Sequence, residues 1–376
     1  MTKYRLGDIC EIVSGSTPKT GVDEYWDGGI KWITPAELND DTYIITDSVR
    51  KITELAVKKT GLSSFPAGTV ILSSRAPIGK VAIAGCEMYC NQGFKNLICS
   101  DIINNRYLYW FLKGNTKYLN SLGRGATFKE ISKSIVSEIE INVPDLNEQA
   151  FVVENLEKIS RIIALRRQEM STLDDLIRAR FVEMFDDWKN RYNPEPLGDY
   201  LEDITYGFTN PMPDADEGPW KITAKDVVNG IVNLETARKT LQDAYDELTA
   251  KSKPQLGDVL LTKDGTLGRT AVVEVENICV NQSVAVLRTN ERVNPKFLSI
   301  LLQMPKYQGD MMADAGGGTI KHIYITKVVK MPIVVPSNGE QEEFLVFVNQ
   351  VDKSKLIAMH IIPKGGFYIW NRTFPF

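Results

Sequence analysis

The side chains that most often carry catalysis are few in this sequence of 376 residues, and their spacing fits no familiar site. His322 and His360 are the only histidines, which excludes an H-E-x-x-H zinc helix and any mechanism that needs several imidazoles. Among the five cysteines, Cys86, Cys90 and Cys99 lie close together but lack the second half of a zinc pattern. The sequence therefore predicts no metal site, and reduced, buried thiols are the favoured interpretation.

Gly79-Lys80 is also incomplete as a phosphate-binding loop. Ser74 stands where the first glycine of such a loop belongs, and Val81 stands where Ser or Thr belongs. Asn193-Pro194-Glu195-Pro196 lacks the aromatic residue of an amino-methyltransferase N-P-P-Y motif, so a linker turn is the better interpretation. Nothing in these motifs indicates an enzyme.

The composition is that of an ordinary globular protein with 43% apolar and 24% charged residues. A chain of this length predicts two or three domains. No apolar run reaches the roughly 18 residues of a membrane span, and the first residues do not form a signal peptide. We therefore expect a soluble, cytoplasmic, multidomain protein without a membrane partner.

The two halves of the sequence contain the same short motifs in the same order. Corresponding motifs are separated by 189 to 192 residues, a period too long for a solenoid repeat. The pairs include Leu6-Gly7-Asp8 with Leu197-Gly198-Asp199, Gly68-Thr69-Val70 with Gly257-Asp258-Val259, Asn91-Gln92 with Asn281-Gln282, Thr127 with Thr319, and Val143-Pro144 with Val335-Pro336. This pattern predicts two copies of one whole domain.

Each copy alternates short β-rich runs with Gly, Pro, Asn and Asp, and contains one amphipathic stretch. Residues 70–72 and 259–261 are typical strands, while residues 107–112 and 297–302 are the amphipathic stretches. The fold class predicted is α+β, an irregular antiparallel sheet plus helices, with the ligand-contacting groups on loops.

A long helix is predicted after each copy. Apolar residues recur at alternating spacings of four and three over residues 147–186, and no Pro or Gly interrupts them. A helix of that length extends about 60 Å. The second helix begins in the same way but stops near residue 360, since Pro363, Gly365 and Gly366 follow.

Together these features resemble the specificity subunit of type I DNA restriction-modification enzymes over residues 4–358. The motifs that carry the resemblance are Leu6-Gly7-Asp8 with Ser14-Gly15-Ser16-Thr17-Pro18, Gly125-Ala126-Thr127, and the Val-Pro…Glu-Gln segments that lead into both helices. The resemblance implies target-recognition domains at 1–143 and 193–335 and a coiled-coil-type spacer helix at 144–192. The second spacer helix, predicted at 336–360, is truncated and is followed by an irregular tail at 361–376, which departs from the family pattern.

The resemblance also implies what this chain does and which proteins assist it. It would read a bipartite, asymmetric site in double-stranded DNA with two domains related by a pseudo-two-fold axis, and would itself be non-catalytic. Methylation subunits that bind S-adenosylmethionine and ATP-driven restriction subunits would dock on it, so this chain would bind no cofactor. Two alternatives are the specificity subunit of a type IIB restriction enzyme and a protein-interaction scaffold that has lost DNA recognition.

The net charge of −4 is unusual for a protein that grips DNA alone. Residues 1–143 carry 17 Lys+Arg and 15 Asp+Glu, whereas residues 193–335 carry 15 and 19. We therefore expect the isolated chain to bind DNA weakly, with the methylation subunits supplying most of the phosphate contacts.

The candidate DNA contacts are basic and hydroxyl side chains at repeated loop positions, which suit base edges and phosphates. They are Lys31, Ser73, Ser74, Arg75, Lys80, Arg124, Lys129, Lys221, Lys263, Arg269 and Lys321. A structural alternative exists for several loops: Thr127 and Glu130 fit a helix capping box, and Asn91 and Asn281 are interpreted as structural amides.

The apolar stripe of the first long helix is longer than the second helix can cover. Met170, Leu173, Ile177, Phe181 and Met184 are therefore expected to lack a partner within the chain. The predicted partner-binding residues are Arg166, Met170, Leu173, Ile177 and Arg180. Self-association through the uncovered stripe is an alternative to the docking of other subunits.

Overall fold

The computed structural model describes residues 1–125, 129–185, 191–228, 230–313, 315–316 and 321–360. The chain divides into two compact units, with Met1–Arg167 in the first and Gln168–His360 in the second. The predicted irregular tail at 361–376 lies outside the described residues.

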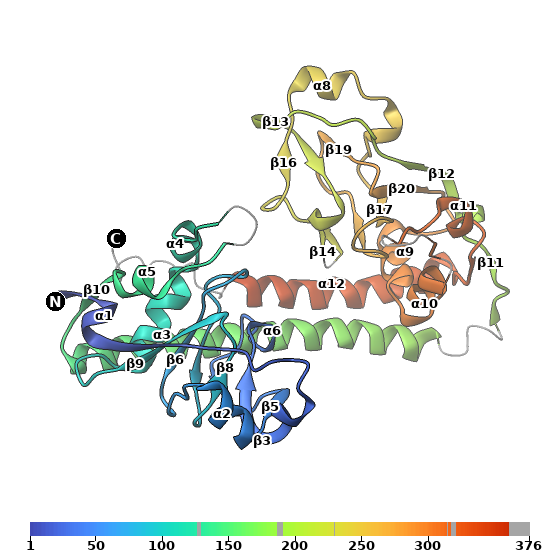
Figure 1. Ribbon diagram of the computed structural model, residues 1–376. Helices are drawn as coiled ribbons and strands as arrows, with labels where there is room; N and C mark the ends of the chain where they lie inside the picture. The colour runs from blue at the N-terminus through green and yellow to red at the C-terminus, as the bar shows by residue number, and fades with distance from the viewer. Residues whose placement is uncertain (126–128, 186–190, 229, 314, 317–320, 361–376) are drawn as a thin grey trace. The chain divides into compact units, whose positions relative to one another are not determined.

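The first unit consists of short strands and helices that lead into one long helix (Figure 1). Its elements are β1 Thr2–Arg5, α1 Leu6–Ile9, β2 Cys10–Ser14, η1 Asp23–Tyr25, β3 Trp26–Ile33, η2 Pro35–Glu37, β4 Ile44–Ile45, β5 Arg50–Ile52, α2 Glu54–Thr60, β6 Val70–Ser73, β7 Val81–Ala84, β8 Tyr89–Cys90, β9 Phe94–Cys99, α3 Asn105–Gly114, α4 Thr116–Ser121, α5 Lys133–Ser137, β10 Glu140–Val143 and the beginning of α6 Leu146–Phe185, which continues into the second unit.

The main sheet of the first unit has the strand order β2-β9-β6-β7-β4 among the described residues. Strands β6 and β7 are buried along their whole length, which explains their unbroken apolar sequences. Helix α3 packs its buried aromatic and leucine residues on this sheet, and Val153 and Leu156 of α6 join the same core. A smaller sheet, β5-β3-β8, packs Trp26 against Trp32.

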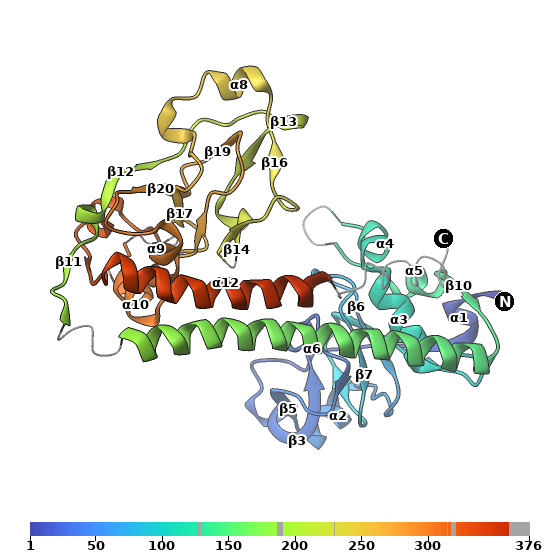
Figure 2. The ribbon, with the colours of Figure 1, turned by 180° about the vertical axis from the view of Figure 1, so that it is seen from behind.

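The second unit repeats this plan with its own helices (Figure 2). Its elements after α6 are β11 Glu195–Pro196, η3 Leu197–Tyr200, β12 Leu201–Tyr206, β13 Ala215–Ile222, η4 Ala224–Asp226, β14 Val227–Val228, β15 Ile231–Val232, β16 Arg238–Lys239, α8 Gln242–Asp246, η5 Ala250–Ser252, β17 Val259–Thr262, β18 Thr270–Val272, β19 Ile278–Val280, β20 Val284–Thr289, α9 Pro295–Leu302, α10 Pro305–Ala313, α11 Ile325–Val328, β21 Pro332–Ile333 and α12 Asn338–His360.

The strand orders of the second unit match those of the first. In the described residues, the sheet β12-β20-β17-β18 corresponds to β2-β9-β6-β7, and β16-β13-β19 corresponds to β5-β3-β8. Helix α9 packs on β17 and β18 as α3 packs on β6 and β7. The predicted duplication and the α+β class are therefore confirmed. The sheets are not purely antiparallel, because β3·β8, β13·β19 and β4·β7 are parallel pairs.

A buried glutamine fixes each long helix to its own domain. Gln149 accepts a hydrogen bond from the Asn104 amide at 2.7 Å and donates to the Pro144 carbonyl at 2.8 Å. Gln341 accepts from the Asn294 amide at 2.8 Å and donates to the Pro336 carbonyl at 2.9 Å. Both side chains are fully enclosed, at 0% and 1% exposure. The glutamine of the repeated Glu-Gln motif therefore attaches each long helix to its own domain.

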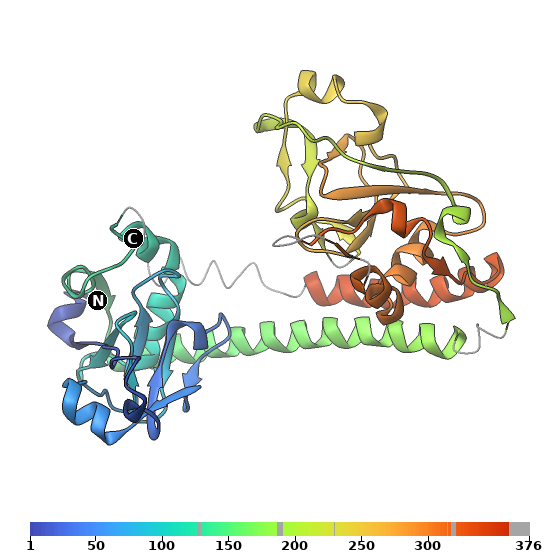
Figure 3. The same cartoon turned by 45° about the vertical axis from the view of Figure 1, so that its right-hand side comes forward.

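Helix α12 runs antiparallel along the C-terminal part of α6 (Figures 1 and 3). Ion pairs join Arg180 to Glu343 at 3.8 Å and Asp174 to Lys355 at 2.6 Å, which sets this direction. Phe181 packs edge-on against Phe344 of α12 at a centroid distance of 5.5 Å.

The expected uncovered stripe is wrong for this part of α6. Ile177, Phe181 and Phe185 are buried in the core of the second unit, and Leu173 and Met184 are packed against it. The stripe is covered because α9 of the second domain, as well as α12, presents aromatic and aliphatic side chains to it. Ile177 therefore belongs to the core of the second unit and Leu173 packs against it, and their binding of a partner stays a prediction.

Candidate nucleic-acid interface

The turn between β6 and β7 is closed by Ser73. Its amide donates to the Lys80 carbonyl at 2.9 Å, and its hydroxyl accepts from the Lys80 amide at 2.8 Å while donating to the Pro77 carbonyl at 2.7 Å. Gly79 also donates its amide to the Ser73 carbonyl, at a φ of 93° that suits glycine. Ser73 therefore shapes the turn that presents Arg75.

The turn between β17 and β18 has the same construction. Thr262 donates its amide to the Arg269 carbonyl at 2.8 Å, and its hydroxyl accepts from the Arg269 amide at 2.9 Å. Gly268, at a φ of 77°, donates to the Thr262 carbonyl. Thr262 thus occupies the place of Ser73, and each domain carries one such turn.

A second segment crosses each turn at its base. Arg124 and Glu130 exchange backbone hydrogen bonds at 3.0 and 2.9 Å, as do Gly316 and His322 at 3.1 and 2.7 Å. The residue that follows then bonds to the turn: the Ile131 amide donates to the Ser74 carbonyl, and the Ile323 amide donates to the Lys263 carbonyl, both at 2.9 Å. Side chains of the turn and of the second segment are thereby brought together.

In the first unit, one carboxylate binds two cations at this crossing. Glu130 accepts from Arg75 Nε at 2.9 Å and pairs with Lys95 Nζ at 3.3 Å. Burial raises the pKa of the Glu130 carboxyl, but the hydrogen bonds from Arg75 and Lys95 outweigh it, so that this pKa lies below its ordinary value. The Glu130 carboxylate consequently stays ionised at neutral pH and orients the Arg75 side chain.

In the second unit the carboxylate lies on the other side of the crossing. The carboxylate now belongs to the turn, where Asp264 pairs with its neighbour Lys263 at 2.9 Å. The opposite segment supplies His322, whose Nδ1 lies 2.5 Å from Asp264 Oδ1. Lys263 Nζ also lies 5.4 Å from the ring centre of Tyr206. The two domains thus share the same backbone hydrogen bonds at this crossing but carry different polar side chains there.

The predicted contact residues have different degrees of exposure. Those with exposed side chains are Arg75, Arg124, Lys129, Arg269 and Lys321. Ser73 and Ser74 are at 0% exposure, and their hydroxyl groups close the turn and meet Lys95. Their contact with DNA stays a prediction. The roles of the exposed residues in DNA binding stay predictions.

Three further candidate lysines are half-buried, and their ammonium groups are used within the chain. Lys31 Nζ lies 3.2 Å from Cys86 Sγ. Lys80 donates to the carbonyls of Pro35 and Leu38. Lys221 pairs with Asp214 at 2.5 Å, and the hydrogen bonds from Lys221 and Arg238 hold the pKa of that carboxyl below its ordinary value.

The structural interpretation of the paired amides is confirmed. Asn91 Oδ1 accepts from the Gly93 amide at 2.9 Å, and Asn281 Oδ1 accepts from the Ser283 amide at 3.2 Å. The capping-box hypothesis is wrong for Glu130, which forms a bridge to Arg75 and Arg124 instead of starting a helix. Its predicted partner, Thr127, lies outside the described residues, as does Thr319.

The predicted docking residues of α6 lie in different environments. Arg180 pairs with Glu183 and Glu343, while Arg166 and Met170 are half-buried. Apolar side chains that are exposed on the same helix include Ile162, Leu165, Leu176 and Val182. The surface available for a partner therefore differs from the predicted stripe.

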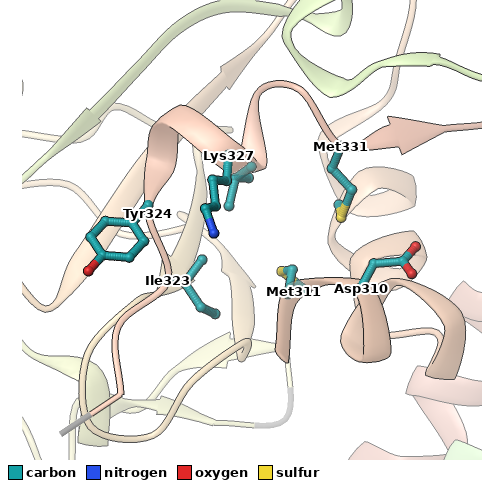
Figure 4. A pocket seen from close by; sticks show the side chains of 7 residues that line it. Asp310, Met311, Ile323, Tyr324, Lys327 and Met331 are labelled. Atoms are coloured by element: carbon teal, nitrogen blue, oxygen red, sulfur yellow. The ribbon is translucent and has the colours of Figure 1, made fainter. Parts of the chain in front are cut away.

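A small pocket lies beside α10 and α11 in the second unit (Figure 4). It is lined by Asp310, Met311, Ile323, Tyr324, Lys327, Val328 and Met331. Met311, Ile323 and Val328 are core residues with no more than 3% exposure. This pocket is a depression over the hydrophobic core, and its polar lining residues are Asp310, Tyr324 and Lys327.

Two negative findings concern the part of the chain that the structure describes. Its His, Cys, Asp and Glu side chains form no group of three or more that could hold a metal ion. None of its helices combines the length and apolarity needed to cross a bilayer.

Sequence reasoning pointed to the Lys263-Asp264 loop but missed Lys95, Glu130 and His322 as members of these clusters. One signal was present for His322: the offset of 192 residues between Thr127 and Thr319 also relates Glu130 to His322. Composition alone gave no reason to prefer this histidine, because an isolated histidine has many roles.

The family model described as the type I restriction modification DNA specificity domain matches residues 1–174 and 212–363. The chain therefore belongs to this family. It is 39% identical over 193 residues to the type I restriction enzyme MjaIX specificity subunit of Methanocaldococcus jannaschii, covering 50% of this chain and 44% of that protein. It is 25% identical over 285 residues to the EcoBI specificity subunit of Escherichia coli, covering 67% and 59%. The matches span less than two thirds of either relative.

One solved structure, from work on the complex assembly and conformational transition of the type I R-M system, has a similar fold. Its TM-score is 0.53 at 16% sequence identity, and the alignment covers 99% of this chain and 95% of that chain. This likeness supports the observed architecture of duplicated domains and long helices.

Proposed function

We propose that this chain is the DNA sequence-specificity subunit of a type I restriction-modification system. The proposal rests on one arrangement that occurs in both domains: a turn meets a second segment of the chain, with Arg75 against Glu130 in the first domain and Asp264 against His322 in the second. The chain also belongs to the matching family. Directional hydrogen-bonding groups held by backbone bonds are what readout of base edges requires. Because the groups differ between the domains, each would prefer different bases, and the site would be bipartite and asymmetric.

In this proposal the chain positions other subunits on DNA in the cytoplasm and performs no reaction itself. Methylation and restriction subunits would supply the S-adenosylmethionine and ATP chemistry. The exposed apolar side chains of α6, with Leu165 at 55% and Leu176 at 46% exposure, are a suitable docking surface. When a partner covers exposed apolar side chains along a helix, their burial stabilises the complex.

Mapping of modified adenines tests the proposal. The chain is co-expressed with the methylation subunit encoded beside it, and genomic adenine modification is compared with cells that express the methylation subunit alone. We expect one bipartite sequence to be modified only when the chain is present. Modification of the same adenines without the chain would refute its role in specificity.

A further inference from the structure

We propose that His322 reads one base pair and that its protonation state decides which base it prefers. The inference rests on the proposed function, and it goes further by assigning a specificity-determining residue and a pH dependence. It begins from the Lys263–Asp264–His322 cluster, which takes the place of Arg75–Glu130 in the second domain.

The geometry fixes how the His322 ring can bind DNA. Nδ1 faces Asp264 Oδ1 at 2.5 Å, so the carboxylate holds the proton on Nδ1. The side chain is 43% exposed, against 20% for Asp264 and 17% for Lys263. Nε2 has no hydrogen-bond partner among the residues that the structure describes, and it is the ring atom available to a ligand.

Each protonation state of the ring would select different bases. With Nδ1 protonated, the neutral ring presents an unprotonated Nε2, which accepts from the exocyclic amino group of cytosine or adenine in the major groove. The imidazolium presents Nε2–H instead, which donates to guanine O6 or N7. The base preference of the ring would therefore depend on pH.

The charged and titratable groups around the ring come from several elements. Asp264 favours the imidazolium, and Lys263, which shares that carboxylate, opposes it. Lys321 is adjacent in the chain, and the Tyr324 ring lies against Gly316, which is the backbone partner of His322. Tyr206 of β12 lies beside Lys263. Asp264 alone among these is in direct hydrogen-bonding contact with the ring in the described part of the chain.

The first domain provides a reference within the same molecule. Arginine side chains in general do not lose their proton in this pH range, and the pKa of the partner carboxyl of Glu130 lies below its ordinary value. Bases that the first domain selects should therefore be the same at about pH 6 and at about pH 8.5.

Selection from a random duplex DNA library, using the chain assembled with its methylation subunit, tests the inference at about pH 6 and about pH 8.5. We expect one position of the second half-site to change from cytosine or adenine to guanine as the pH falls, with enrichment on the order of tenfold for each preferred base. His322→Gln should abolish this change, whereas His360→Gln, which alters the other histidine, should retain it. Asp264→Asn should move the change to lower pH, because it removes the charge that favours the imidazolium.

The outcomes separate this inference from the proposed function. Selection of no sequence at either pH would refute the function itself. Selection of a bipartite sequence that is identical at both pH values, or a pH response that His322→Gln retains, would refute the role of His322 alone. Unchanged first-half selection by the His322→Gln complex shows that this variant still folds and assembles.

Discussion

At the scale of single residues, the side chains suited to DNA readout are those that neighbouring groups orient. A positive charge alone does not identify them. Arg75 is oriented because Glu130 accepts from its Nε, and Glu130 is itself fixed by Lys95. Lys80 resembles Arg75 in charge but gives its ammonium group to backbone carbonyls. Residue type predicted both as contacts, whereas their surroundings distinguish them.

The Glu130 cluster should make a pH-dependent contribution to stability. Its folded-state pKa is lowered, so its stabilisation is present above the ordinary glutamate pKa of about 4.3 and is lost as the pH falls through the folded value. Glu130→Gln should therefore lower the free energy of unfolding at about pH 7 by on the order of 0.5–1 kcal/mol, since the side chain is 34% exposed and screened by solvent.

Denaturant unfolding of the wild type and of Glu130→Gln at several pH values measures this difference. It should shrink as the pH falls below the ordinary glutamate pKa and through the lowered folded-state value. Glu154→Gln is the control, because the pair of Glu154 with Lys158 is exposed on both sides and should contribute less. A difference that grows as the pH falls would contradict the assignment.

At the scale of elements, α6 is held in the second unit by aromatic packing. Phe181 is 4% exposed and contacts Phe185, Phe297 and Phe344 at centroid distances of 5.0, 5.9 and 5.5 Å. The heptad spacing predicted the helix correctly. It did not predict that α9 covers the stripe, because that contact depends on how the domain folds back on its own helix.

Removing the Phe181 ring should destabilise the second unit strongly. Phe181→Ala creates a cavity and should lower the free energy of unfolding by about 3–5 kcal/mol. The neighbouring Val182 is 54% exposed, and Val182→Ala should change it by less than about 0.5 kcal/mol. Denaturant titration that gives equal effects for both variants would contradict the observed packing.

The exposed face of α6 should bind the methylation subunit. Leu165→Asp and Leu176→Asp place charges on that face and should weaken co-purification with the subunit by on the order of tenfold each, without lowering thermal stability. Val49→Asp is the matched control, because Val49 is an exposed apolar residue of the first domain, at 86% exposure. Pull-down yields equal to wild type for both α6 variants would exclude this surface.

At the scale of the whole molecule, duplication was the most informative feature of the sequence. The repeated motifs predicted two α+β domains, and the turns closed by Ser73 and Thr262 are built by equivalent hydrogen bonds. The site was predicted less completely. Burial of Ser73 and Ser74, and the pairing of Asp264 with His322, arise where distant segments cross, which local spacing does not encode.

The central claim is that each domain specifies one half of a DNA site through its turn and the segment that crosses it. The turns at residues 74–79 and 263–268 have equal length and equivalent closing bonds, so one can replace the other. The variant carries the sequence of residues 263–268 at positions 74–79, together with Glu130→His to supply the partner of the transferred aspartate.

Mapping of methylated adenines by this variant, assembled with the methylation subunit, is the most direct measurement. We predict that the base preference changes in one half of the site, while the other half and the spacing between them are the same as in the wild type. Methylation of an unchanged sequence, or a change in both halves, would contradict the account.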